Sequence, residues 1–259
     1  MQGDEMNIIF LLGREIRYFT NFNNKMYQFL LFFQPLMFLT IIHFLNQVRG
    51  DAASGKTVVA AALISMWSYV LYSSGSALMS QKWNDTLKLL MAAPTSLFSV
   101  ILTKALSNSF IALISMLLSF VYAKFIFGFN LDIRDYGLFF MSVLVLILSL
   151  SVAGLILAVV FVASQNVYDF QNLILTPMIL LCGVFIPVES FPFILKWVAY
   201  LVPMTWGIKT VHEALDLSPS LLETMMVSIL ISLVYLALAY FIVKKIESIL
   251  RRSGSLGAI

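Results

Sequence analysis

The sequence is poor in charge, cysteine and histidine. Only 11% of its 259 residues are charged, against about 25% in a soluble domain, so the chain lacks the polar surface that water requires. The single cysteine, Cys182, excludes a disulfide within one chain, and its apolar surroundings favour a small buried side chain. The two histidines, His43 and His212, do not have the spacing of a zinc-binding helix. We therefore predict no catalytic residue, no metal site and no cofactor bound by this chain.

Long apolar runs fill the sequence instead. Hydrophobic residues make up 61% of the chain, and a helix needs about 20 of them to cross the hydrocarbon core of a membrane. Six runs meet this requirement, at Lys25–Asn46, Thr57–Met79, Phe98–Phe127, Tyr136–Ala163, Phe170–Pro187 and Leu221–Val243. The predicted fold class is an all-α integral membrane protein, in which residues 1–259 form a single transmembrane domain with six transmembrane helices.

The segment between the fifth and sixth runs is apolar but broken. From Gly183 to Trp206 it contains three prolines and two tryptophans. Broken backbone is tolerated in a membrane only where protein or a water-filled cavity satisfies its polar groups. We therefore predict a re-entrant hairpin at residues 183–212 that lies at the outer surface and gates a transport path. The predicted gate residues are Phe185, Pro187, Glu189, Pro192, Trp197, Pro203 and Trp206.

The charges near the ends of the spans predict an orientation. Six spans place both termini on one side, together with ten of the 16 Lys and Arg residues. The positive-inside rule then predicts cytoplasmic termini. The N-terminal stretch has acids where a signal peptide has basic residues, so we expect no cleavable signal there. Residues 5–19 instead predict an amphipathic helix on the membrane surface.

The loop between the second and third spans predicts a short amphipathic helix at residues 81–93. Apolar residues recur on one face at helical spacing, and charged residues fall on the other. Such a helix can serve as a handle for a soluble partner or can be an inert connector, and the pattern does not separate the two. The residues that would contact a partner are Lys82, Trp83, Asp85, Leu87, Lys88, Leu90 and Met91.

One motif imitates a phosphate-binding loop. Residues Gly50 to Thr57 match G-x-x-x-x-G-K-[ST], but a functional loop of this kind follows a buried strand and opens a soluble helix. Here a membrane span precedes the motif and another follows it. We interpret the motif as a polar turn between two spans.

Polar residues inside the spans are almost all uncharged. Lys104 and Lys124 lie near the ends of the third span, where their side chains can extend to the surface. The candidates for lining a path are Gln34, Asn108, Asn172 and Thr176, although hydrogen bonds between helices are the commoner role of such residues. An ion-coupled secondary transporter should show membrane-embedded charges and paired broken spans, and a membrane enzyme should show a catalytic cluster. The sequence shows neither pattern.

Two segments carry a resemblance to a known family. The run from Gly183 to Trp206, and Met91-Ala-Ala-Pro-Thr-Ser96 followed by Lys104, resemble the permease subunit of type-2 ABC exporters. Relatives often begin the loop helix with Lys/Arg-Glu-x-Gly-Thr, whereas this chain has Lys82-Trp-Asn-Asp-Thr86. The resemblance therefore implies that Asp85 takes the role of the glutamate in that pattern.

The resemblance implies a mechanism and partners. It implies a homodimer of this permease in the plasma membrane, docked through residues 81–93 to two cytoplasmic ABC ATPase subunits that hold the ATP and Mg²⁺. The partners would thus be those ATPases, a second copy and the lipid bilayer, with no nucleic acid. The implied activity is export of an amphipathic or drug-like substrate from the cytoplasm or inner leaflet. Export of a lipid-linked glycan or polysaccharide, and ion-coupled secondary transport, are the alternatives.

Overall fold

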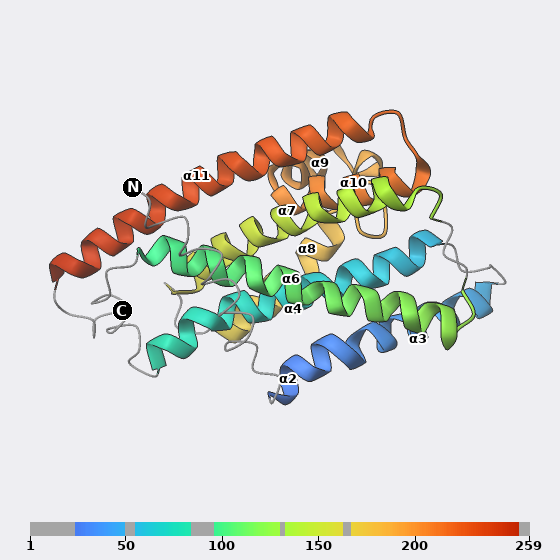
Figure 1. Cartoon of the computed structure of the whole chain (residues 1–259), viewed down its shortest axis with the longest axis horizontal. Coiled ribbons are helices and arrows are strands. Elements are labelled where there is room, and N and C mark those ends of the chain that lie inside the picture. Colours follow the sequence, from blue (N-terminus) through green and yellow to red (C-terminus); the bar gives the residue numbers. More distant parts are fainter. Residues whose placement is uncertain (1–23, 50–54, 84–95, 130–132, 163–166, 254–259) are drawn as a thin grey trace.

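The computed structural model describes residues 24–49, 55–83, 96–129, 133–162 and 167–253. Within these ranges every regular element is helical (Figure 1). In chain order the elements are α2 (Lys25–Gln28), the π-helical turn η1 (Phe29–Phe33), α3 (Gln34–Arg49), α4 (Gly55–Trp83), α6 (Leu97–Phe125), α7 (Tyr136–Val162), α8 (Val167–Leu181), the 3₁₀ turn η2 (Val188–Ser190), α9 (Phe193–Leu201), α10 (Pro203–Asp216) and α11 (Leu221–Ser253).

Five helical stretches in the described part of the chain are long and apolar enough to cross a membrane. They are Lys25–Val48, Gly55–Ser74, Leu97–Phe125, Tyr136–Val160 and Leu221–Ser248, and they correspond to the first four and the sixth of the predicted spans. The predicted fifth span is α8, which has 15 residues, contains Pro177 and ends at Leu181 rather than at Pro187. At 1.5 Å per residue α8 is about 22 Å long, shorter than the roughly 30 Å hydrocarbon core.

The first span contains a π-helical turn just ahead of a proline. Pro35 has no N–H, so it cannot donate the usual helical hydrogen bond to the carbonyl of Leu31. One residue earlier, the N–H of Gln34 donates to the carbonyl of Phe29, five residues back. The wider turn keeps α2, η1 and α3 in one continuous helical segment.

Helix α4 lies at the centre of the bundle. It contacts α3, α6, α7, α8 and α10, and large side chains such as Trp67 and Leu63 are fully buried among them. A helix that is apolar on all sides belongs in the interior of a bundle. Helix α7 approaches it closely, because a Cβ atom on Gly154 would lie 2.9 Å from the Ser74 hydroxyl oxygen. Small residues at this pair therefore allow the two helices to pack closely.

The segment from Gly183 to Asp216, called the hairpin below, is packed against one end of the bundle. Helix α10 contacts α7, α11 and α4. Figure 1 shows that α4 and α7 begin, and α6 ends, at the end of the bundle where α10 leads into α11; we call this the hairpin end. The position of Gly207 makes the contact with α7 possible, because any Cβ atom there would meet the side chain of Ser149.

Candidate functional site

The three prolines of the hairpin start its short helical segments. Pro187 precedes η2, Pro192 precedes α9, and Pro203 is the first residue of α10. A proline fits these positions because the first turn of a helix has no partner for its N–H groups. Ahead of them, Gly183 ends the run from α8 with a φ of +80°, and a Cβ there would lie 2.8 Å from Val188. Glycine is therefore the residue this turn requires.

The turn between α9 and α10 is fixed by three hydrogen bonds from side chains. The Thr205 hydroxyl donates to the Ala199 carbonyl over 2.7 Å, and the Trp206 indole donates to the Tyr200 carbonyl over 2.9 Å. The third bond comes from α11, whose Tyr235 hydroxyl donates to the Leu201 carbonyl over 2.6 Å. These donors bind carbonyl groups in the last turn of α9, where the helical hydrogen bonds end. The Ala199 carbonyl also accepts the backbone N–H of Val202.

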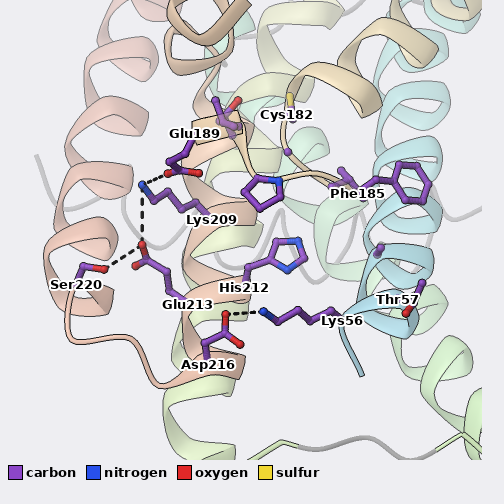
Figure 2. A pocket seen from close by; sticks show the side chains of 16 residues that line it. Lys56, Thr57, Cys182, Phe185, Glu189, Lys209, His212, Glu213, Asp216 and Ser220 are labelled. Carbon is purple, nitrogen blue, oxygen red and sulfur yellow. Dashed lines mark hydrogen bonds and ion pairs between the residues drawn. The ribbon is translucent and has the colours of Figure 1, made fainter. Parts of the chain in front are cut away.

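A cavity of about 640 Å³ lies between the hairpin and the start of α4 (Figure 2). Its wall combines apolar groups such as Val184 and Phe185 with a set of ionisable side chains. The ionisable residues are Lys56 on α4, Glu189 in η2, and Lys209, His212, Glu213 and Asp216 on α10. Three carboxylates therefore face two ammonium groups and one imidazole around a space large enough for a small organic molecule.

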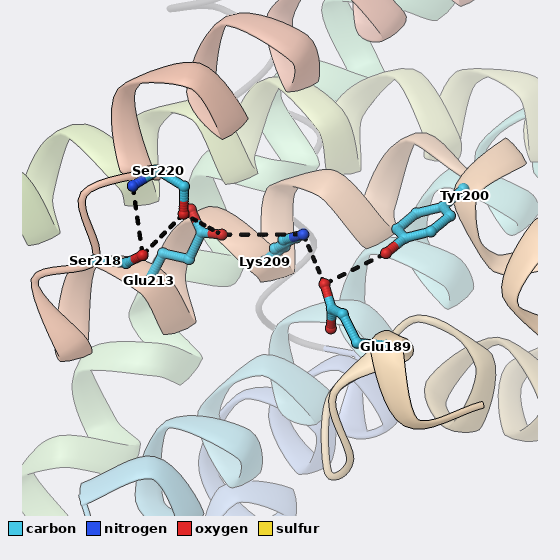
Figure 3. A network of polar contacts seen from close by, with 6 residues as sticks. All are labelled: Glu189, Tyr200, Lys209, Glu213, Ser218 and Ser220. Atoms are coloured by element: carbon cyan, nitrogen blue, oxygen red, sulfur yellow. Dashed lines mark hydrogen bonds and ion pairs between the residues drawn. The ribbon is translucent and has the colours of Figure 1, made fainter.

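Lys209 is the hub of the polar contacts in the hairpin (Figure 3). Its ammonium nitrogen lies 2.6 Å from the Glu189 carboxylate and 4.0 Å from the Glu213 carboxylate. The Tyr200 hydroxyl donates to the same Glu189 oxygen over 3.3 Å, and the Ser220 hydroxyl donates to Glu213 over 3.1 Å. The network thus joins η2, α9, α10 and the start of α11.

Both partners of the closest ion pair have shifted pKa values. Burial raises the pKa of Glu189, but the hydrogen bond and charge of Lys209 outweigh it, so that the net pKa lies below the ordinary value. Burial lowers the pKa of Lys209, but contact with Glu189 outweighs it and the net pKa is raised. Each group therefore holds the other in its charged form at neutral pH.

A second ion pair connects the hairpin to α4. The Lys56 ammonium lies 2.8 Å from the Asp216 carboxylate, and Figure 2 shows His212 beside this pair at the floor of the cavity. Burial lowers the pKa of His212, as does the nearby charge of Lys56, while a hydrogen bond with the Val184 backbone and the charge of Asp216 oppose the shift. The imidazole is consequently neutral at pH 7.

Acidification is expected to destabilise the folded protein by protonating His212 in the hairpin. The pKa of His212 is lower in the folded protein than in the unfolded chain. Its contribution to the free energy of unfolding is therefore fully present above about pH 6.5 and is lost as the pH falls from there. The ionisable groups around it are Lys56 and Asp216 at the floor of the cavity, with Glu189, Lys209 and Glu213 on the other walls. The thermal unfolding midpoint should fall between pH 7.5 and pH 5.5, and His212→Gln should reduce that fall.

His43 provides the matched control for this titration. It lies on α3, where its ring contacts Phe127 and Phe129 rather than the hairpin cavity. His43→Gln should keep the pH dependence of the wild type. An unchanged pH dependence in His212→Gln would show that the imidazole does not contribute.

The structure places all seven predicted gate residues in the hairpin. Phe185, Pro187 and Glu189 line the cavity, while Pro192 and Pro203 start helices as described above. The Trp206 ring lies 5.1 Å from that of Tyr200, whereas Trp197 is 61% exposed and faces away from the core. Their action as a gate stays a prediction.

The other predicted site residues are not brought together in the described structure. The Asn108 amide donates to the Ser74 hydroxyl over 3.4 Å, which joins α6 to α4. The side-chain amide oxygen of Gln34 (Oε1) is buried without a hydrogen-bond partner. The side chains of Asn172 and Thr176 on α8, and of Lys82 and Trp83 at the end of α4, lie outside the described residues. So do residues 5–19 and Asp85, Leu87, Lys88, Leu90 and Met91.

The sequence does not predict the charged residues that contact the predicted gate residues or line the same cavity. The sequence pattern marks Lys56 only as part of the motif that imitates a phosphate-binding loop, and it predicts no role for Lys209, Glu213 or Asp216. A signal was present, because Lys209 and Glu213 stand four residues apart on one helix face, as do His212 and Asp216. Lys104 also differs from expectation, since its side chain is buried in the bundle rather than extended to the surface.

A helical bundle with five potential spans and a hairpin packed into one end defines the class of multi-pass α-helical membrane proteins. The family model described as ABC-2 type transporter matches residues 6–215. This is most of the chain, which therefore belongs to the ABC-2 type transporter family as a membrane component, or permease. No individual curated protein matches the chain significantly. Permeases of this family lie in the bilayer, and a separate cytoplasmic ATPase hydrolyses ATP for them.

Proposed function

We propose that this permease is the transmembrane subunit of an ATP-driven exporter that moves an amphipathic or drug-like substrate out of the cytoplasm or inner leaflet. The observation that carries the proposal is the cavity beneath the hairpin, which lies at one end of the central helix. Its wall mixes apolar side chains with paired charges, which suits a molecule that is partly apolar and partly polar.

Helix α4 links that cavity to the expected ATPase contact. It is continuous from Gly55 to Trp83, so Lys56 stands in the cavity wall at one end while the other end enters the predicted coupling helix at 81–93. A soluble partner that moves the coupling helix would move α4 with it. The helix would then shift Lys56 relative to Asp216 and the hairpin.

The hairpin is re-entrant in this proposal, and the remaining span is formed by α8. Tyr235, which holds the hairpin turn at Leu201, stands fourteen positions after the first residue of α11. That is about 21 Å along the helix, more than half of a hydrocarbon core of roughly 30 Å. The turn between α9 and α10 would therefore lie near or beyond the bilayer middle.

The proposed orientation rests on the charge pattern of the sequence, and the proposed assembly rests on the resemblance to type-2 ABC exporters. Both termini and residues 81–93 would face the cytoplasm, since most Lys and Arg residues lie on that side. Two copies would pair as a homodimer in the plasma membrane and bind two ATPase subunits. The exposed apolar face of α9, with Phe193, Ile194 and Trp197, suits contact with lipid or with the second copy.

Inverted membrane vesicles test the activity and its direction together. Vesicles holding the permease and the ATPase that co-purifies with it should take up a fluorescent amphiphile, rhodamine 6G, when ATP is added outside. The double variant Trp83→Ala, Leu87→Ala should lose most of the retained ATPase and of the uptake, because it removes the apolar face of the coupling helix. Lys56→Ala, which alters the false phosphate-binding motif, should keep ATPase binding and ATP hydrolysis.

Three results would contradict the proposal. Normal ATPase recovery with the double variant would show that residues 81–93 do not form the contact. Loss of nucleotide binding in Lys56→Ala would mean that the motif at Gly50–Thr57 is functional. ATP-driven release of dye from inverted vesicles would reverse the direction of transport.

A further inference from the structure

A second cavity, unrelated to the hairpin, lies in the bundle surface between α6 and α7. Its volume is about 730 Å³, and its walls are apolar apart from Lys124 and Tyr136. Leu117 on α6 and Phe140 on α7 are both more than half exposed. The cavity is therefore an open apolar groove on the surface of the bundle.

The groove has the length of one leaflet of a bilayer. On α6 its lining runs from Lys124 back to Leu113, and on α7 it runs from Tyr136 to Ile147. Each stretch spans eleven residue-to-residue steps along its helix, or about 16 Å. Half of a hydrocarbon core of roughly 30 Å is about 15 Å. The groove thus begins at the hairpin end of the bundle and reaches the bilayer middle.

The charge of the groove is at its surface end. Lys124 is exposed in the last turn of α6, and no carboxylate among the described residues forms an ion pair with it. Tyr136, the first residue of α7, lines the same groove, and tyrosine rings commonly lie at the level of lipid headgroups. A cation above an apolar channel of this length complements an anionic headgroup above an acyl chain.

We propose that this groove binds one glycerophospholipid with a net negative charge from the leaflet at the hairpin end. One acyl chain occupies the groove between α6 and α7, and the phosphate lies at Lys124. The site is separate from the transport cavity, which is built from α4, α10 and the segment after α8. It would favour anionic lipids over zwitterionic lipids of the same chain length.

Lipid retention measured by native mass spectrometry tests the headgroup contact. The protein is released from nanodiscs that contain equal amounts of phosphatidylglycerol and phosphatidylcholine with identical acyl chains. The retained lipid should be enriched in phosphatidylglycerol about fivefold, which corresponds to about 1 kcal/mol for one lysine near the headgroups. Lys124→Gln should abolish the enrichment. Lys196→Gln, which removes a lysine of the hairpin outside the groove, should preserve it.

A groove-filling variant tests the acyl-chain contact. Leu117→Trp places a large ring in the groove at an exposed position and should reduce the retained lipid of both headgroups. Leu230→Trp adds the same ring at an exposed position on α11 and should leave retention unchanged.

The proposal fails under any of three results. Enrichment that survives Lys124→Gln would remove the headgroup contact, and retention that survives Leu117→Trp would remove the acyl-chain contact. Efficient disulfide linkage of two copies through Leu117→Cys, in a Cys182→Ala background, would show that the groove is an interface between permeases.

Discussion

Adding one methyl group at Gly207 is expected to destabilise the permease by about 1–3 kcal/mol, the usual cost of overpacking a core. In Gly207→Ala the new Cβ would collide with the Ser149 side chain and lie 3.2 Å from the Leu146 backbone. The serine cannot turn away freely, because its hydroxyl donates a buried 2.9 Å hydrogen bond to the Leu146 carbonyl. The result should appear as a lower thermal unfolding midpoint and as protease cleavage within residues 193–216.

A compensating variant separates this collision from other effects of alanine. Ser149→Gly removes both atoms of the serine that the new methyl group meets, so the double variant should recover part of the lost stability. Ala237→Leu adds a larger group on the exposed face of α11 and should change the stability by less than about 0.5 kcal/mol. A Gly207→Ala protein as stable as the wild type would mean that α10 does not pack against α7 as described.

Replacing Lys209 with methionine is expected to reduce ATP-dependent dye uptake about tenfold, which corresponds to about 1.4 kcal/mol. The change keeps much of the side-chain volume but leaves the carboxylates of Glu189 and Glu213 without their shared cation. Partly exposed ion pairs contribute only about 0–1 kcal/mol each to stability. Transport should therefore fall more than the yield of folded complex. Glu189→Gln removes the charge of one partner and should have a smaller effect in the same direction.

Two comparisons make this expectation specific to the network. Lys196→Met removes a neighbouring lysine, which lies 6.0 Å from the centre of the Tyr200 ring and has no carboxylate partner among the described residues. ATP-dependent dye uptake by the Lys196→Met variant should stay near that of the wild type. If Lys209→Met instead reduces the yield of complex while uptake per complex is normal, the hairpin is structural and the gate interpretation is wrong.

The sequence predicts five of its six spans well, but it does not predict where every helix ends. The Tyr136–Ala163 prediction differs from α7 by one residue, because an apolar run flanked by polar residues marks a span directly. Helix α11 continues ten residues beyond Val243, since Lys and Arg are good helix formers that hydropathy does not count. The early end of α8 depends on the backbone at Gly183, which a hydropathy pattern does not contain.

The candidate site is predictable where its parts are close in sequence. The prolines and tryptophans of residues 183–212 mark the hairpin, and spacing on α10 could have marked Lys209 with Glu213. The Lys56–Asp216 contact joins residues 160 positions apart, so it depends on how α10 packs against α4. The same holds for Tyr235, whose bond to Leu201 is fixed only by the position of α11.

The packing of α10 between α7 and α11 also sets the order in which the chain can mature during synthesis. The hairpin emerges before α11, yet α11 supplies one of its walls and the Tyr235 hydroxyl that holds its turn. In the proposed re-entrant arrangement, the broken backbone at Gly183 and Pro203 would have only part of its protein environment until α11 enters the membrane, and lipid could not replace the rest. We therefore expect the hairpin, if it is re-entrant as proposed, to reach its final packing only after the last span is in place.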